Sequence, residues 1–247
     1  MPNDIALVTG ANKGIGRAIT AQLAEAGYVV YLGSRDAGRG RRAAEELAAG
    51  RRDVRFLALD VTEQASVDAA AAVIGEESGH LDVLVNNAGI FVPGPTAPSE
   101  TTAGDMARTY DTNVFGVVRV TNAMLPLLRK SHAARIVNVG SEVASLHNLA
   151  DGGNPAGEFP VLLAYNSSKS ALNAITIAYA KELADAGIKV NVAAPGYVAT
   201  DLNGHAGMIS PEQGARIPVR MATLPAEGPT GTFAAAGENG ETINLAW

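Results

Sequence analysis

The chain has 247 residues, of which 47% are hydrophobic and 18% are charged, and it carries a formal net charge of −6. This length fits one large α/β domain or two small ones, and the negative charge argues against a general binder of nucleic acids or anionic membranes. The sequence has no cysteine, which excludes a disulfide framework and thiolate metal sites. Its four histidines lack the spacing of metal ligands, so we expect no metal site.

The start of the chain and its hydropathy pattern bear on location. The first apolar run begins at Ile5, which leaves no room for a signal peptide. No apolar stretch approaches the roughly 20 residues that a membrane-spanning helix needs. We therefore expect a cytoplasmic protein with no membrane partner and no nucleic-acid partner.

Short apolar runs alternate with helical patterns along the chain. The runs that we expect to be strands cover 5–8, 28–32, 54–59, 81–85, 136–139, 189–192 and 241–245. The expected helices cover about 15–26, 39–49, 62–79, 103–128, 163–186 and 211–224. The stretch 146–160, rich in glycine and proline, is expected to be irregular.

This alternation, without a linker or a repeat, predicts one α/β domain over 1–247. Its architecture would be a Rossmann-type, doubly wound parallel sheet of about seven strands with helices on both faces. In such sheets, ligands bind outside the carboxyl ends of the strands. The residues that the pattern places at those ends are Thr9, Arg35, Asp60, Asn86, Ser141 and Pro195.

A glycine-rich loop, from Thr9 to Gly16, separates the first strand from the first helix. Glycine is favoured where the backbone turns tightly or where another group approaches closely. A helix N-terminus adds free N–H groups and partial positive charge, which suit a phosphate. The loop therefore indicates a dinucleotide pyrophosphate site. A turn without a ligand is the alternative, because the spacing G-x-x-x-G-x-G differs from G-x-G-x-x-G.

Tyr165 and Lys169 lie four residues apart on an expected helix, so their side chains share one face. A free phenol has a pKa near 10, and a nearby ammonium lowers that pKa toward the range useful for acid–base catalysis. A solvated helix edge is the alternative explanation of the pair.

Two further polar residues stand at positions that favour a role in a site. Ser141 follows a strand and can donate a hydrogen bond to a carbonyl oxygen, although a turn serine is the alternative. A nucleophilic role for it is less favoured, because the pattern G-x-S-x-G is absent. Asn113 stands in a helical pattern close to Gly116, where a kink or a polar contact is expected; the alternative is an exposed helical asparagine.

Together these residues resemble the short-chain dehydrogenases/reductases over nearly the full length of the chain. The matching motifs are Thr9-x-x-x-Gly14-x-Gly16, Asn86-Asn87-Ala88-Gly89, Asn113, Ser141, Tyr165-x-x-x-Lys169 and Pro195-Gly196 with Thr200. The resemblance is closest to the carbonyl-reductase-like branch. It rests there on the loop 10–16, on Ser34-Arg35-Asp36 and on the run 165–169.

The resemblance implies hydride transfer between a nicotinamide and a carbonyl or alcohol carbon of a small molecule. It assigns the general acid to Tyr165, with Lys169 lowering its pKa and holding the nicotinamide ribose. It makes Ser141 the group that orients the substrate oxygen. Asn113 would hold a helix kink and a water that relays protons to Lys169.

The resemblance also implies a set of cofactor contacts, among which the pair 60–61 would meet the adenine. The full set is Gly10, Asn12, Lys13, Gly14, Ile15, Gly16, Arg35, Asp60, Val61, Asn87, Ala88, Gly89, Tyr165, Lys169, Pro195, Gly196, Val198 and Thr200. For Asp60, an ordinary strand-end carboxylate in a turn is the alternative.

The first charged residue after the second strand bears on the choice between NADP(H) and NAD(H). A base there suits the 2′-phosphate of NADP(H), and an acid suits the ribose diol of NAD(H). Arg35 comes first, and Lys13 and Arg39 could extend a phosphate site. Asp36 follows immediately and favours the diol. We expect NADP(H).

The chain departs from the family pattern between Ser141 and Tyr165. These residues are 24 positions apart, and most members of the family have a shorter gap. We expect the insertion, about 146–162, to form a substrate wall, and 200–224 to act as a lid. A homodimer or homotetramer is possible, and so is a monomer.

The expected reaction is NADPH-dependent reduction of a ketone or aldehyde. The alternatives are a steroid, sugar or acyl-carrier-linked ketone as substrate, or a cofactor-sensing module without catalysis.

Overall fold

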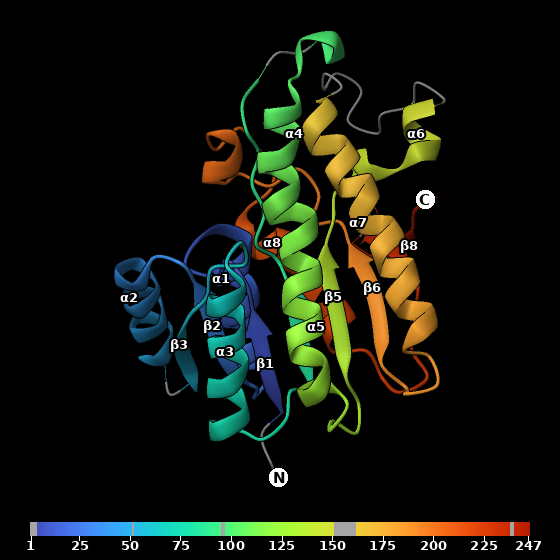
Figure 1. The fold of residues 1–247 in the computed structure, drawn as a ribbon. Helices are drawn as coiled ribbons and strands as arrows, with labels where there is room; N and C mark the ends of the chain where they lie inside the picture. Colours follow the sequence, from blue (N-terminus) through green and yellow to red (C-terminus); the bar gives the residue numbers. More distant parts are fainter. Residues whose placement is uncertain (1–3, 51, 95–96, 151–161, 238–239) are drawn as a thin grey trace.

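A computed structural model describes residues 4–50, 52–94, 97–150, 162–237 and 240–247, in which a twisted sheet is covered by helices on both faces (Figure 1). The strands of the described residues are β1 (Ile5–Val8), β2 (Val29–Ser34), β3 (Val54–Ala58), β4 (Val83–Asn86), β5 (Arg135–Val139), β6 (Lys189–Ala193), β7 (Phe233–Ala236) and β8 (Thr242–Asn244). Their order in the sheet is β3-β2-β1-β4-β5-β6-β7-β8. All neighbouring pairs are parallel except β7 and β8. This is the doubly wound, Rossmann-type fold that the sequence predicts.

Helices lie on both sides of the sheet. Their bounds are α1 (Gly14–Glu25), α2 (Ala37–Ala48), α3 (Gln64–Glu77), α4 (Ala103–Tyr110), α5 (Gly116–Leu128), α6 (Leu146–Ala150), α7 (Leu163–Glu182), α8 (Pro211–Gly214) and α9 (Arg216–Ala222). In Figure 1, α3, α5 and α7 stand in front of the sheet, and α1 and α8 are seen behind it.

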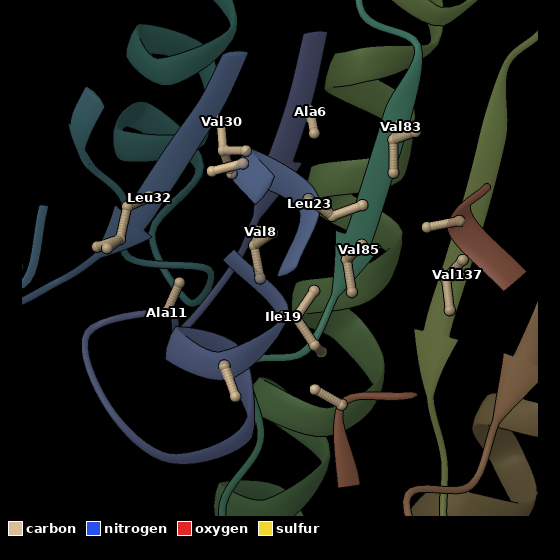
Figure 2. Close-up of a cluster of buried hydrophobic side chains, with 14 of the residues drawn as sticks. Ala6, Val8, Ala11, Ile19, Leu23, Val30, Leu32, Val83, Val85 and Val137 are labelled. Atoms are coloured by element: carbon tan, nitrogen blue, oxygen red, sulfur yellow. The ribbon is translucent and has the colours of Figure 1, made fainter. Parts of the chain in front are cut away.

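The strands are buried on both faces, which is why their sequences are continuous apolar runs. Side chains alternate between the two faces, so Val8 packs with α1, α2 and α9, whereas Leu7 packs with α3 and α5. Figure 2 shows the first of these two clusters, in which Ile19 and Leu23 of α1 lie against the sheet.

Three expectations about the elements need correction. The sheet of the described residues has eight strands rather than about seven, because Phe233–Ala236 is also a strand, and the last strand is antiparallel. The alanine-rich sequence of β7 has little strand propensity of its own, and the segment is a strand because it pairs with β6. The stretch expected to be irregular begins with a short helix, α6. The expected helix over 103–128 consists of α4, a π-helical turn at Asp111–Phe115, and α5.

The expected insertion and the expected lid can each be compared with the described residues. Residues 151–161, most of the expected insertion, lie outside the described residues. In the expected lid, Ile217 and Met221 of α9 are buried in the core, so a mobile cover there would end before that helix. Among the described residues, no helix combines the length and the apolar character needed to cross a membrane.

Candidate functional site

A cavity of about 1110 Å³ opens at the carboxyl ends of the central strands. This lies above the range of about 300–1000 Å³ that is typical of sites for one small ligand. Strands β1 and β4 are neighbours whose connections run to opposite sides of the sheet, and this switch point is where doubly wound sheets bind ligands. All the residues predicted to contact a cofactor line the cavity, and so does Ser141. Asn113 is not among the lining residues.

Close packing explains the glycines of the first loop. Gly10 and Gly14 have φ angles of +62° and +54°, in the left-handed region. A Cβ atom on Gly10 would lie 2.9 Å from the Cα of Ala88, and one on Gly16 would overlap the side-chain amide of Asn87. The loop therefore lies against the turn after β4 with no room for side chains, and its backbone forms part of the cavity wall.

Thr9 and Asn87 join these two turns. The Thr9 hydroxyl oxygen accepts hydrogen bonds from the backbone N–H groups of Asn87 and Ala88, at 3.0 and 2.9 Å. The side-chain amide of Asn87 donates to the carbonyl oxygens of Thr9 and Gly10, at 2.9 and 3.1 Å. The amide of Asn87 thus holds the loop in place, and the residue borders the cavity as part of this clamp.

Ser141, Tyr165 and Lys169 meet at one wall of the cavity. Ser141 follows β5, and the other two stand one turn apart at the start of α7. The Lys169 ammonium lies 5.9 Å from the centre of the Tyr165 ring, and it donates a 2.9 Å hydrogen bond to the carbonyl oxygen of Val139. These are the three side chains that the sequence singled out for catalysis and that the fold brings together.

Burial governs the acid–base properties of this group. It lowers the pKa of Lys169 from its ordinary value of 10.5 to about 8. It also raises the pKa of Tyr165, and a hydrogen bond with the Ser141 side chain offsets part of that rise. The direction for Tyr165 is opposite to the one predicted from its spacing to Lys169. The reason is that burial disfavours the phenolate, while the ammonium is held by the Val139 carbonyl.

Asn113 lies behind this wall in the π-helical turn, and it is 1% exposed. Its Oδ1 accepts a 2.8 Å hydrogen bond from the Ile90 N–H, and its Nδ2 donates to the Ile90 carbonyl at 3.0 Å and to the Ser168 hydroxyl at 3.1 Å. The expected irregularity with polar contacts is therefore present. A Cβ on Gly89 would lie 3.5 Å from the Asn113 Oδ1 and 3.6 Å from the Lys169 Nζ, so both atoms border one small space.

At the opposite end of the cavity, Arg35 is exposed and follows β2. Asp36 is the N-cap of α2: its carboxylate accepts a 2.9 Å hydrogen bond from the Arg39 N–H and forms a 2.8 Å ion pair with the Arg39 side chain. These contacts lower the pKa of Asp36, with the backbone hydrogen bond as the largest cause. Asp36 is thus already engaged. Lys13, a predicted phosphate ligand, forms a 2.6 Å ion pair with Asp201.

Asp60 takes the turn role that the sequence left open. Its carboxylate accepts hydrogen bonds from the N–H and the hydroxyl of Thr62, at 3.0 and 2.7 Å, and its own N–H donates to Ser66. It also lines the cavity beside Val61. The two interpretations of Asp60 are therefore compatible.

Several cavity residues were not found from the sequence. The Phe91 ring stands edge-on to Tyr165, with ring centres 5.9 Å apart. The others are Ser34, Leu59, Thr62, Ile90, Pro93, Gly94, Thr112, Val139, Gly140, Glu142, Val143, Asn166 and Tyr197. The cavity residues Leu162, Asp201, Leu202, Asn203 and Gly204 fall in the segments expected to form the substrate wall and the lid. Only Glu142 has a signal that could have identified it, because it is a charged residue directly after Ser141. Among the described residues, no cluster of three or more histidines and carboxylates is placed to hold a metal ion.

Comparisons with known proteins agree with this geometry. The family model described as short chain dehydrogenase matches residues 4–208. "Short-chain dehydrogenase/reductase 1" of Saponaria officinalis is 37% identical and covers 92% of this chain and 92% of its own. "Carbonyl reductase [NADPH] 1" of Bos taurus is 35% identical, covering 94% and 95%. The solved structure of NADPH-bound carbonyl reductase from chicken fatty liver superposes with a TM-score of 0.84 at 27% identity, over 100% of both chains.

Proposed function

The chain belongs to the short-chain dehydrogenase/reductase family, in its carbonyl-reductase-like branch, and on that premise we propose that it reduces a ketone or aldehyde to an alcohol with NADPH. One observation carries the proposal. The loop of glycines and the group of Ser141, Tyr165 and Lys169 line the same cavity at the switch point of the sheet.

The residues present fit a dinucleotide. The glycine loop lines the cavity and leads into the N-terminus of α1, where no side chain caps the first N–H groups, and such free N–H groups favour a phosphate. Val61 and Asp60 border the part of the cavity that we assign to the adenine. When bound, the nicotinamide cofactor supplies the hydride.

The protein's own part is to place the carbonyl group and to provide a proton. Tyr165 keeps its proton at neutral pH because burial raises its pKa, so its hydroxyl can donate to the carbonyl oxygen. The Ser141 hydroxyl donates a second hydrogen bond to that oxygen and fixes its position. Phe91 packs against the Tyr165 ring and limits the directions in which the phenol can turn.

Lys169 and Asn113 would return the proton to Tyr165. Lys169 has a pKa of about 8, so its ammonium can give up a proton near neutral pH. Its Nζ and the Asn113 Oδ1 border one space next to Gly89, which suits a water that links the ammonium to bulk solvent. Lys169 acts on Tyr165 from the same cavity wall, and Asn113 acts from behind it.

The choice of NADPH over NADH rests on Arg35. Its guanidinium is exposed at the cavity edge, and its fork of N–H donors matches a phosphate. The counter-argument is Asp36, which would hold a ribose diol. The Asp36 carboxylate is already committed to Arg39 and to the cap of α2, which weakens that counter-argument.

The test is turnover. We expect the purified protein to oxidise NADPH in the presence of at least one member of a panel of ketones, aldehydes and quinones, with NADH clearly less effective. The loss of NADPH absorbance measures the rate, and the panel without protein is the control. Tight NADPH binding without turnover of any member would overturn the proposal and favour a cofactor-sensing module.

A further inference from the structure

Glu142 is a cavity residue for which the proposed reduction has no use. It follows Ser141 in the first turn of the short helix Glu142–Ala144 and lines the cavity. It is half-buried, and burial raises the pKa of its carboxyl. Among the described residues, no charged neighbour contributes to that shift.

The other carboxyl groups of the cavity wall differ from Glu142 in one respect. Asp36 is paired with Arg39, Asp201 is paired with Lys13, and Asp60 is held by the turn at residue 62. Each of these three carboxylates therefore has a stabilising partner of its own. The carboxyl of Glu142 forms no hydrogen bond or ion pair with any residue in the part of the chain that the structure describes.

The surroundings of Glu142 do not supply a partner cation. Apolar side chains that line the same cavity include Phe91, Val143 and Leu162. Lys169 lines the same cavity, but its ammonium is buried and bonded to the Val139 carbonyl. A carboxylate taken out of water without a partner is costly, and a ligand that brings a cation recovers that cost on binding.

We propose that Glu142 makes this protein selective for carbonyl compounds that carry a cationic nitrogen. This inference rests on the proposed reduction and adds the substrate class. Tyr165 and Ser141 fix the carbonyl oxygen, and Glu142 is the next residue along the chain, about 3.8 Å away between Cα atoms. Glu142 lines the same cavity as Ser141 and Tyr165, so a substrate with a short aliphatic spacer between its carbonyl carbon and its cationic nitrogen can reach all three.

A pair of probes with the same shape tests the selectivity. One is a methyl ketone that carries a trimethylammonium group on a short spacer, and the other is its carbon isostere with a tert-butyl group. The two differ in charge and not in size, and the charge does not depend on pH. The measured quantity is the ratio of their kcat/KM values in the presence of NADPH.

We expect the wild-type ratio to favour the cationic ketone by about tenfold or more, as attraction between opposite charges in a half-buried site implies. In Glu142→Gln the ratio should fall to about one, because the amide keeps the shape and loses the charge. Glu45→Gln, an exposed position on α2, removes the same charge far from the site and should keep the wild-type ratio. A wild-type ratio of one or less, or an unchanged ratio in Glu142→Gln, would overturn the inference.

Failure of the proposed reduction gives a different result. If neither ketone nor any panel member is reduced, the chemistry is wrong, but calorimetric binding of the two probes to the protein with NADPH still tests Glu142. About tenfold tighter binding of the cationic probe to the wild type, lost in Glu142→Gln, would support the inference. Equal binding of the two probes to the wild type would overturn it.

Discussion

Replacing Asn113 by alanine removes the side chain that holds the π-helical turn to the wall of the cavity. The wild-type amide makes three hydrogen bonds at 2.8–3.1 Å, two of them to the backbone of Ile90 and one to the Ser168 hydroxyl. Ser168 keeps another partner, because its hydroxyl also donates to the Tyr165 carbonyl at 2.7 Å. The two Ile90 groups are the ones that lose their partner.

Each buried polar group left without a partner costs about 1–3 kcal/mol, and the two Ile90 groups are part-buried, so the loss of stability should be about 2–4 kcal/mol. This is less than the total stability of most domains, about 5–15 kcal/mol, so the variant should fold. Because residue 168 precedes Lys169, we also expect kcat to fall more than KM rises, as positioning of the proton path is lost.

Urea unfolding followed by circular dichroism measures the stability term. The matched control is Asn122→Ala on α5, where an exposed asparagine accepts one hydrogen bond from Tyr179. We expect the control to cost less than about 1 kcal/mol. If Asn113→Ala costs no more than this control, the reasoning from the three hydrogen bonds is refuted.

Three further predictions concern other parts of the site. The pKa of Lys169 lies below its ordinary value, so the cost of burying the charge, about 3 kcal/mol, is fully present below pH 8 and is relieved as the pH rises toward 10.5. Urea unfolding should therefore show Lys169→Met gaining stability over the wild type at neutral pH and losing that advantage at high pH; a constant difference would contradict this. Arg35→Asp should raise the Kd for NADPH by about tenfold more than that for NADH, measured by calorimetry, and equal losses would remove Arg35 from the phosphate site. Gly16→Ala should lower the free energy of unfolding by about 1–3 kcal/mol, because the added Cβ meets Asn87. The control Gly38→Ala should raise it by about 0.5–1 kcal/mol, because there a Cβ makes only an ordinary contact at 3.6 Å with Asp36. If urea unfolding gave the opposite order, the packing argument would be contradicted.

The fold was largely predictable because its information is local. Continuous apolar runs such as Ile5–Val8 have the pattern of strands buried on both faces, and each is followed by a helix with a recognisable end. The strand β7 was missed because Phe233–Ala236 carries no strand signal of its own and is fixed by pairing with β6. A strand that is fixed by tertiary pairing cannot be recognised from its local sequence.

The same distinction between local and tertiary information applies to the candidate site. The motif spacing placed Ser141, Tyr165 and Lys169 correctly at one cavity, because strand ends and a helix repeat are local features. The direction of the Tyr165 pKa and the engagement of Asp36 depend on burial and on partners, which only the folded arrangement supplies. The N-cap role of Asp36 had a readable signal, since aspartate before a helix is a favoured cap.

Tyr165→Phe tests the central claim most directly, because it removes one hydroxyl group and leaves the ring and its contact with Phe91. The account predicts that kcat for carbonyl reduction falls by about 10²–10⁴-fold, while the Kd for NADPH stays within about twofold of the wild type. Turnover at the wild-type rate would contradict Tyr165 as the proton donor. A comparable loss of NADPH binding would assign the hydroxyl to the cofactor instead.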